Sequence, residues 1–282
     1  MKIKISADST LDLPREFLEK YDIGVVPMNV VCDGKEYKDG VDITAQDLFD
    51  CVEAGGESHT AAINASEYTE FFDAWLREYD AVVHITLSRE LSADFQDATL
   101  AGEGKPVYVV DSRNLSSSGG MLAIRGAELA AAGETPEKIA ETLSALAYKI
   151  ATSFVIDTLK YLRRGGRCSA LAALGANVLK LKPCIEVHTD TGKMDVGKKY
   201  RGNFETVLMQ YVEDRLRGRA DEIDTSAIYL THAAGVSDEV LDKVRAKVAE
   251  YVKFDAVYAP VAGCTISNHC GPVCLGLLFF EK

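Results

Sequence analysis

The chain begins with Met1-Lys2-Ile3-Lys4-Ile5, where charged and apolar residues alternate as in a β-strand that buries one face. Further strand-like runs follow in the first half, and segments with helical spacing separate them. The predicted strands are Lys2–Ala7, Gly24–Val31, Ala81–Thr86 and Pro106–Val110, and the predicted helices are 44–53, 66–78, 90–101, 118–132 and 136–149. Strands that alternate with helices imply right-handed crossovers. We therefore expect residues 1–150 to form a Rossmann-like α/β domain with a mostly parallel sheet.

The second half has a different pattern, and we expect residues 151–282 to form a second α/β domain. Its predicted strands are 152–156, 183–188, 193–197, 227–231, 255–259 and 274–280, and its predicted helices are 169–178, 203–217 and 237–252. Two hairpin turns are also expected, at Asp33-Gly34 in the first half and at Thr189-Asp190-Thr191-Gly192 in the second. A hairpin within an α/β domain predicts a mixed sheet. The length of 282 residues also favours two domains, packed together with a cleft between them.

A basic loop interrupts the second half at Arg163-Arg164-Gly165-Gly166-Arg167-Cys168-Ser169. Arginine offers a rigid fork of donors that suits a carboxylate or a phosphate, and glycine lets the backbone come close to such a group. The loop therefore favours an anion site. An ordinary solvated loop whose arginines pair with nearby carboxylates explains the same residues.

The charge is unevenly distributed along the chain. The net charge is −12, and residues 1–150 carry 13 basic and 27 acidic side chains. Within 160–201 there are 10 basic and 3 acidic side chains. The acidity argues against broad nucleic-acid binding, which needs a large basic surface. A local positive patch suits a small anion or an acidic protein partner.

The seven cysteines show no C-x-x-C spacing, so we expect no disulfide framework. Three of them lie close to His269, but their spacing matches no common zinc motif, and we expect neither a metal nor a cofactor. The longest apolar run, Val273 to Phe280, is too short for a membrane helix. The N-terminal residues lack the apolar region of a signal peptide, so a cytoplasmic location is expected.

Several short motifs occur in a fixed order along nearly the whole chain. They are Ala7-Asp8-Ser9-Thr10-Leu11-Asp12-Leu13-Pro14, Val26-Pro27-Met28-Asn29-Val30, Tyr37-Lys38-Asp39-Gly40, His59-Thr60-Ala61-Ala62, Leu87-Ser88-Arg89-Glu90-Leu91-Ser92, Val110-Asp111-Ser112, Gly165-Gly166-Arg167, Lys182-Pro183, Tyr200-Arg201-Gly202 and His269-Cys270-Gly271-Pro272. In this order they resemble the DegV family, the fatty-acid-binding proteins that partner bacterial fatty acid kinases.

The resemblance implies a DegV-type fold of two α/β domains that holds a long-chain fatty acid in an apolar tunnel. A separate kinase subunit would phosphorylate the carboxylate, so this chain would bind and present the acid and would not be an enzyme. By the same resemblance, Thr60 and Ser92 are the hydroxyl donors to the carboxylate. Arg167 and His269 are the cationic side chains beside it, and Arg201 belongs to the surface that docks the kinase.

The chain departs from the family pattern at three places. Ala61 follows Thr60 where the family usually has Ser, and Val273 stands where it often has Gly. Ala93-Asp94 replaces the Gly-Thr that the family favours after Ser92. Asp94 therefore adds a negative charge near the proposed carboxylate site, unless its side chain points to solvent.

Each proposed site residue also has a structural interpretation. Thr60 can cap a turn, and Ser92 can cap the helix that follows it. His269 can be a structural hydrogen-bonding residue, and Arg163 and Arg164 are expected to be solvated or to face a partner. Asp8, at the end of a predicted strand, fits a ligand site or, slightly better, a cap for the helix that starts near Pro14.

Two hypotheses from other functional classes remain open. The first is an enzyme that acts on a small phosphorylated or carboxylated metabolite in the interdomain cleft, with Asp8 or His269 as acid or base. The second is an interaction protein whose basic segment docks an acidic partner. No P-loop, G-x-G-x-x-G or G-x-S-x-G motif is present. A long apolar tunnel would favour the fatty-acid carrier, and a short polar cleft would favour the enzyme.

Overall fold

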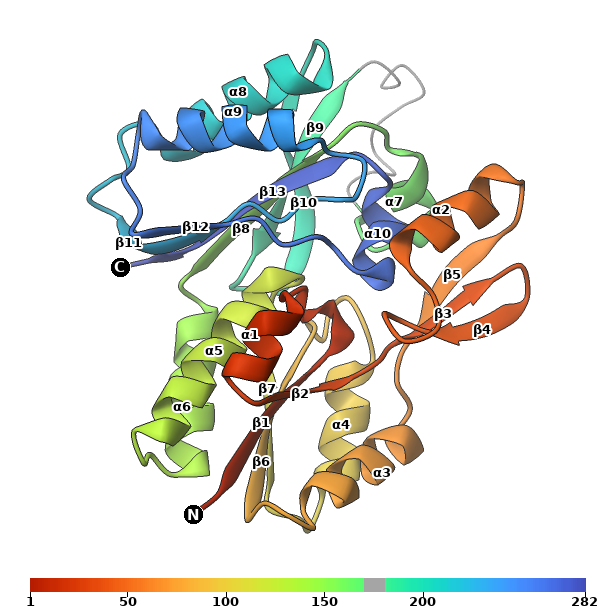
Figure 1. Ribbon diagram of the computed structural model, residues 1–282, viewed down its shortest axis with the longest axis vertical. Helices are drawn as coiled ribbons and strands as arrows, with labels where there is room; N and C mark the ends of the chain where they lie inside the picture. Colours follow the sequence, from red (N-terminus) through yellow and green to blue (C-terminus); the bar gives the residue numbers. More distant parts are fainter. Residues whose placement is uncertain (170–180) are drawn as a thin grey trace.

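Strand β1 (Ile3–Asp8) lies inside a parallel sheet of strand order β2-β1-β6-β7. The other three strands are β2 (Ile23–Val26), β6 (Ala81–Thr86) and β7 (Val107–Asp111), and all pairings are parallel. The computed structural model describes residues 1–169 and 181–282. In Figure 1 this sheet forms the centre of the lower half of the molecule. The parallel sheet predicted for the first half is confirmed.

Helices cover both faces of the parallel sheet (Figure 1). Val83 and Ile85 of β6 pack with α5 (Ser117–Ala131) and α6 (Pro136–Ala147), whereas Val82 packs with α3 and α4 on the opposite face. Three further helices of this half are α1 (Arg15–Lys20), α3 (Ala65–Trp75) and α4 (Asp94–Gly102). Because both faces are covered, most residues of these strands are buried, including the polar Lys4 and Ser6 of β1.

A small antiparallel sheet of order β4-β3-β5 extends from the parallel sheet. It consists of β3 (Asn29–Cys32), β4 (Lys35–Lys38) and β5 (Ser58–Ala61), and α2 (Ala45–Glu53) packs beside it. The Asp33-Gly34 turn joins β3 to β4 as predicted. The prediction of one strand over Gly24–Val31 is wrong, because the chain leaves the parallel sheet at Pro27-Met28, where proline has no N–H to donate to a ladder. Strand β5 was not expected.

The second half contains a mixed six-stranded sheet of order β10-β9-β8-β13-β11-β12, in which only β11 and β12 pair in parallel. The strand bounds are β8 (Ile150–Ile156), β9 (Lys182–His188), β10 (Lys193–Tyr200), β11 (Ile223–Tyr229), β12 (Ala256–Tyr258) and β13 (Cys274–Glu281). The predicted mixed sheet is confirmed. The predicted boundary after residue 150 stays a prediction, and all but the first residue of the predicted helix 169–178 lies outside the described residues.

Successive side chains of β13 point to opposite faces of the mixed sheet, and the two faces pack against different parts of the molecule. Leu275, Leu277 and Phe279 pack under α8 (Phe204–Leu216) and α9 (Asp238–Ala249). Side chains on the other face of the strand, such as Cys274 and Leu278, point toward the first half of the chain. The mixed sheet therefore buries one face within its own half and uses the other to build the contact between halves.

A short helix of the second half, α10 (Cys264–Cys270), is held by two carboxylates of the first half. The N–H of Gly263 donates to Asp12 at 2.8 Å, and Asp39 accepts from the N–H groups of Cys264 at 2.9 Å and Thr265 at 3.1 Å. These N–H groups have no partner within the helix. The two carboxylates therefore fix where α10 begins, beside α2 and near α7 (Lys160–Gly165). Figure 1 shows these three helices next to one another.

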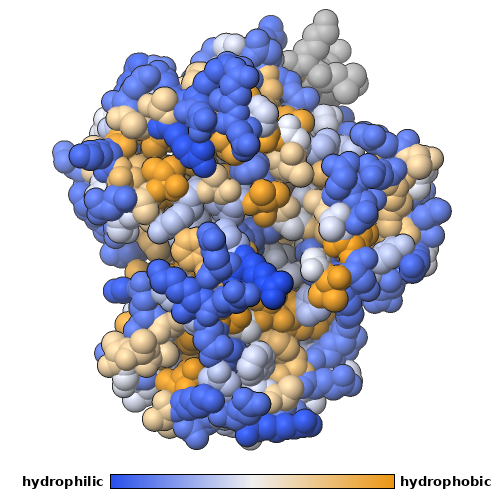
Figure 2. Space-filling model, viewed as in Figure 1, coloured by the Kyte–Doolittle hydropathy of each residue, from blue (hydrophilic) through white to orange (hydrophobic). Residues whose placement is uncertain are grey.

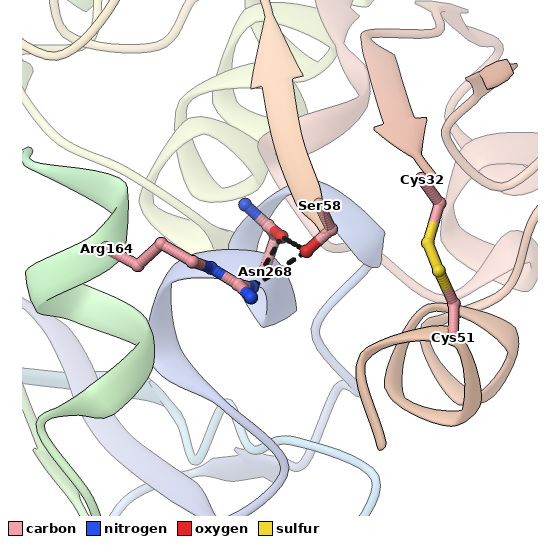
Figure 3. Close-up of a disulfide and its surroundings, with 5 residues drawn as sticks. All are labelled: Cys32, Cys51, Ser58, Arg164 and Asn268. Carbon is pink, nitrogen blue, oxygen red and sulfur yellow. Dashed lines mark hydrogen bonds between the residues drawn. A yellow bond between two sulfur atoms is a disulfide. The ribbon is translucent and has the colours of Figure 1, made fainter. Parts of the chain in front are cut away.

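One disulfide corrects the expectation drawn from the cysteine spacing. Cys32 on β3 is bonded to Cys51 on α2 (Figure 3), with a Cα–Cα distance of 6.8 Å. The two residues are 19 positions apart in a spacing that matches no motif. Only the packing of α2 against β3 brings them together.

None of the helices in the two described ranges is both long enough and apolar enough to cross a membrane.

Replacing Asp39 by Ala removes the acceptor of two N–H groups at the start of α10. Buried N–H groups without partners are unfavourable, so we expect the free energy of unfolding to fall by about 1–3 kcal/mol, as measured by urea denaturation. Asp221→Ala is the matched control, because this carboxylate is exposed in the loop before β11 and its loss should change stability by no more than about 0.5 kcal/mol. Equal stability of the Asp39 variant and the wild type would contradict the role assigned to Asp39.

Candidate functional site

A cavity of about 50 Å³ lies between the two halves of the molecule. Both halves supply its walls. The lining residues are Met28, Thr60, Ala61, Ala62, Leu87, Leu91, Ser92, Leu115, Phe154, Leu162, Arg167, Met194, Thr265, Ile266, His269 and Cys270. Most of these side chains are apolar. On the face shown in Figure 2, hydrophilic residues cover most of the surface, and hydrophobic ones show through where the halves meet.

The structure brings together the four residues predicted to bind a ligand. Thr60 lies on β5, Ser92 in the loop between β6 and α4, Arg167 just after α7, and His269 on α10. All four line the cavity, although 209 residues of sequence separate the first from the last. Arg201 is exposed just after β10 and does not line this cavity.

His269 forms a hydrogen bond with Thr60, and the Nε2–Oγ1 distance is 3.0 Å. Burial lowers the pKa of His269 to about 4, and the positive charges of Arg167 and Arg164 contribute. With these neighbours the ring is neutral at pH 7, and an anion bound beside it would raise its pKa, so the cationic role of His269 stays a prediction. A neutral ring that donates its Nε2 proton to Thr60 leaves the threonine proton available for a ligand.

Gly165 makes room for this histidine. A Cβ at position 165 would lie 2.0 Å from Nδ1 of His269, a distance that no side chain can take. Nδ1 is buried and has no hydrogen-bond partner among the residues that the structure describes. Glycine at this position in the basic loop is therefore required for the imidazole to reach Thr60.

Arg167 lies at the mouth of the cavity and is held by two carbonyl groups. Its Nε donates to the carbonyl of Leu91 at 3.3 Å, and its Nη1 donates to that of Gly165 at 2.8 Å. The side chain is largely exposed. Both acceptors are neutral carbonyl groups, so these two hydrogen bonds hold the guanidinium in place without neutralising its charge. The charge can therefore act on an anion at the mouth.

Arg164 is exposed, as expected, and it also links three elements. Its guanidinium donates to Ser58 on β5 at 2.7 Å and to Asn268 on α10 at 3.4 Å (Figure 3). Ser58 in turn donates to Asn268 at 2.6 Å. Within the basic loop, Arg164 therefore binds two neighbouring elements and Arg167 lines the cavity, while an anion site at this loop stays a prediction.

Asp94 is fully buried behind Ser92 and does not point to solvent. Its carboxylate accepts hydrogen bonds from the N–H of Ile63 at 2.9 Å and the hydroxyl of Tyr68 at 3.2 Å. The hydroxyl of Ser92 donates to the other oxygen of Asp94. Helix α4 begins at Asp94, four residues later than predicted, so Ser92 lies in the preceding loop and does not cap the helix.

Asp8 has a structural role in this site. It accepts from the N–H of Leu87 at 2.6 Å and from the N–H of Thr10 at 3.0 Å, and it caps the short 3-10 helix η1 (Ser9–Leu11), not the helix near Pro14. Burial and the nearby negative charge of Asp94 together raise the pKa of Asp8 to about 7. Asp8 is absent from the lining of the cavity, so it orients the loop that carries Leu87 and Ser92.

The sequence analysis missed one polar residue of the cavity wall, Thr265. Its hydroxyl is buried and has no hydrogen-bond partner in the described part of the chain. It lies one turn before His269 on α10, a helix that was not predicted. The flanking Gly263 and Gly271 are the signal that could have marked this short helix.

A second, smaller apolar cavity of about 20 Å³ adjoins the first. The two share Leu115, Phe154, Ile266 and Cys270 as walls. The second cavity continues along the inner face of β8 and β13, so apolar space extends from the mouth toward the mixed sheet.

No cluster of three or more His, Cys, Asp or Glu side chains that could hold a metal ion occurs in residues 1–169 and 181–282.

The fold and the cavity define a protein of two α/β halves that surround an apolar cavity with hydroxyl, imidazole and guanidinium groups at its mouth. A family model described as "Uncharacterised protein, DegV family" matches residues 2–282. The chain belongs to the DegV family.

Relatives cover the chain from end to end. A DegV domain-containing protein of Caldanaerobacter subterraneus subsp. tengcongensis is 30% identical over 284 residues, which span 100% of this chain and 99% of the relative. A solved DegV family protein from Thermus thermophilus, described by its fatty acid binding, is 26% identical with a TM-score of 0.89, and each chain is covered fully. A Thermotoga maritima protein, described as revealing fatty acid binding function, is 25% identical with a TM-score of 0.84 over 100% of both chains.

Gly165→Ala tests the contact between the basic loop and His269. The added methyl group would displace the imidazole, so we expect a loss of about 1–3 kcal/mol in the free energy of unfolding and a changed NMR environment of the His269 ring. Gly119→Ala is the matched control, because a Cβ at this buried helical glycine would lie 3.8 Å from its nearest neighbour. An unchanged His269 resonance in the Gly165 variant would show that the ring does not pack against this glycine.

Proposed function

We propose that this protein binds a long-chain fatty acid in the apolar cavity and presents its carboxylate to a separate fatty acid kinase. The observation that carries the proposal is that Thr60, Ser92, Arg167 and His269 all line one cavity whose other walls, apart from Thr265, are apolar. The relatives from Thermus thermophilus and Thermotoga maritima, which are described as fatty acid binding, support it.

The apolar walls suit the tail of such a ligand. About 14 methylene groups gain roughly 11 kcal/mol on leaving water, at about 0.8 kcal/mol each. This favourable free energy offsets much of the unfavourable free energy of association, such as that of lost translational freedom. The small-metabolite enzyme fits less well, because a small polar substrate would leave most of these walls without a partner.

The polar side chains of the cavity wall suit the head group. A carboxylate that leaves water must keep hydrogen bonds and opposite charge, because an unpaired buried charge is strongly unfavourable. Thr60 and Ser92 offer hydroxyl groups, and Arg167 offers the positive charge at the open mouth. His269 contributes by orienting Thr60 through its Nε2 hydrogen bond.

The kinase partner would supply the chemistry. An open mouth leaves one carboxylate oxygen within reach of ATP bound to another subunit, and the exposed Arg201 would belong to the docking surface. The chain itself would then act as the binding subunit and not as an enzyme. ATP-dependent phosphorylation in trans agrees with the cytoplasmic location expected from the sequence.

Arg167→Ala and Thr60→Val should each weaken fatty acid binding about tenfold or more, because each removes a hydrogen bond to a charged group. Titration with myristate and mass spectrometry of lipids extracted from the purified protein measure the effect. Arg245→Ala, which removes a half-exposed arginine of α9 that does not line the cavity, is the control and should bind as the wild type does. A wild-type protein that carries no acyl chain and takes up none would disprove the proposal.

Arg201→Glu should leave myristate binding unchanged and abolish acyl phosphate formation in the presence of a fatty acid kinase subunit and ATP. The physical reason is that a reversed charge on the docking surface repels the partner without touching the cavity. Arg245→Glu makes the same charge change on α9 and should remain active. If Arg167→Ala retained ligand fully while Arg201→Glu lost the partner, a pure interaction protein would be favoured instead.

A further inference from the structure

Ser92 has one hydroxyl proton, and the structure assigns that proton to Asp94. The hydroxyl of Ser92, which lines the cavity, donates to Oδ2 of Asp94, which does not line it. The other oxygen of Asp94 is occupied by the N–H of Ile63 and the hydroxyl of Tyr68. In this arrangement Ser92 offers only lone pairs to the cavity, and lone pairs do not attract a carboxylate.

The surroundings of Asp94 favour the protonated form of its carboxyl group. Burial raises the pKa of Asp94, whereas its hydrogen bonds with Ser92, Ile63 and Tyr68 act in the opposite direction. The ionisable groups that face it are Tyr68 from α3 and Asp8 from the end of β1, and Asp8 carries the same sign of charge. Asp97, on the same helix as Asp94, adds a further negative charge near Tyr68. Within the described residues, no Lys or Arg forms an ion pair with Asp94.

A bound acid would place Ser92 between two carboxyl groups. The hydroxyl of Ser92 can donate its proton to only one of the two carboxyl groups. A hydrogen bond between Ser92 and the other carboxyl group therefore needs a proton on that group, which is either Asp94 or the ligand. Two carboxylates that share a site cannot both stay ionised without a large repulsion. The complex therefore holds one extra proton, whether it resides on Asp94 or on the carboxyl group of the ligand.

From this geometry we infer that the cavity binds its fatty acid together with one proton, which Asp94, Ser92 and the ligand carboxyl group share. The inference rests on the proposed function. It makes Asp94 a positioning residue that sets the direction in which Ser92 donates. Because protonation of the shared pair favours binding, affinity falls as the pH rises.

The test is the affinity of the full-length protein for myristate between pH 6 and 9.5. Between the pKa of Asp94 in the free protein and the higher pKa of the shared pair in the complex, we expect the Kd of the wild type to rise about tenfold per pH unit. Calorimetry in buffers of different ionisation enthalpy should then show an uptake of about one proton per bound myristate. In Asp94→Asn the amide donates to Ser92 at every pH, so we expect a Kd that is independent of pH and no proton uptake.

Two further variants locate the proton. Ser92→Ala removes the shared hydroxyl while Asp94 stays, and it should bind more weakly and without proton uptake. His269→Gln removes the other group that could take a proton at the mouth, and it should keep the uptake of the wild type. Loss of the uptake in His269→Gln, or the same uptake in Asp94→Asn as in the wild type, would overturn the inference. Absence of myristate binding at any pH would instead refute the proposed function.

Discussion

The candidate site depends on two carboxylates of the first half that bind the start of a helix from the second. Asp12 and Asp39 accept the N–H groups of Gly263, Cys264 and Thr265, which no carbonyl within the helix can reach. Helix α10 carries several side chains of the cavity wall, among them Thr265 and His269. The hydrogen bonds therefore do more than join two halves, because they set the position of the imidazole with respect to β5 and the basic loop.

Burial governs the charges around the cavity. His269 is neutral because it is desolvated between two arginines, and in this state it forms a hydrogen bond with Thr60. Asp94 sits behind Ser92, where the negative charge has no ion-pair partner among the described residues. The first half of the chain thus contributes a carboxyl group next to the site, that of Asp94. The positive charge at the mouth comes from Arg167 in the basic loop of the second half.

The sequence allowed the regular parts of the fold to be predicted, because local patterns encode them. Helix α2 begins with the capping box of Thr44, and α6 begins with Thr135 as its cap, as their residues indicate. Helix α10, strand β5 and the Cys32–Cys51 pair escaped prediction. Each is short or has a spacing without a motif, and each is stabilised by residues far away in the chain.

The sequence by itself determined the alternation of strands and helices, the hairpin turns and the family, because periodicity and ordered motifs need no knowledge of distant contacts. It also named the four residues that line the mouth, through the resemblance to relatives. Only the tertiary structure decided how their protons and charges are arranged. The neutral His269, the structural Arg164 and the buried Asp94 follow from desolvation and from partners that approach from other elements, and such distances are set only when the chain has folded.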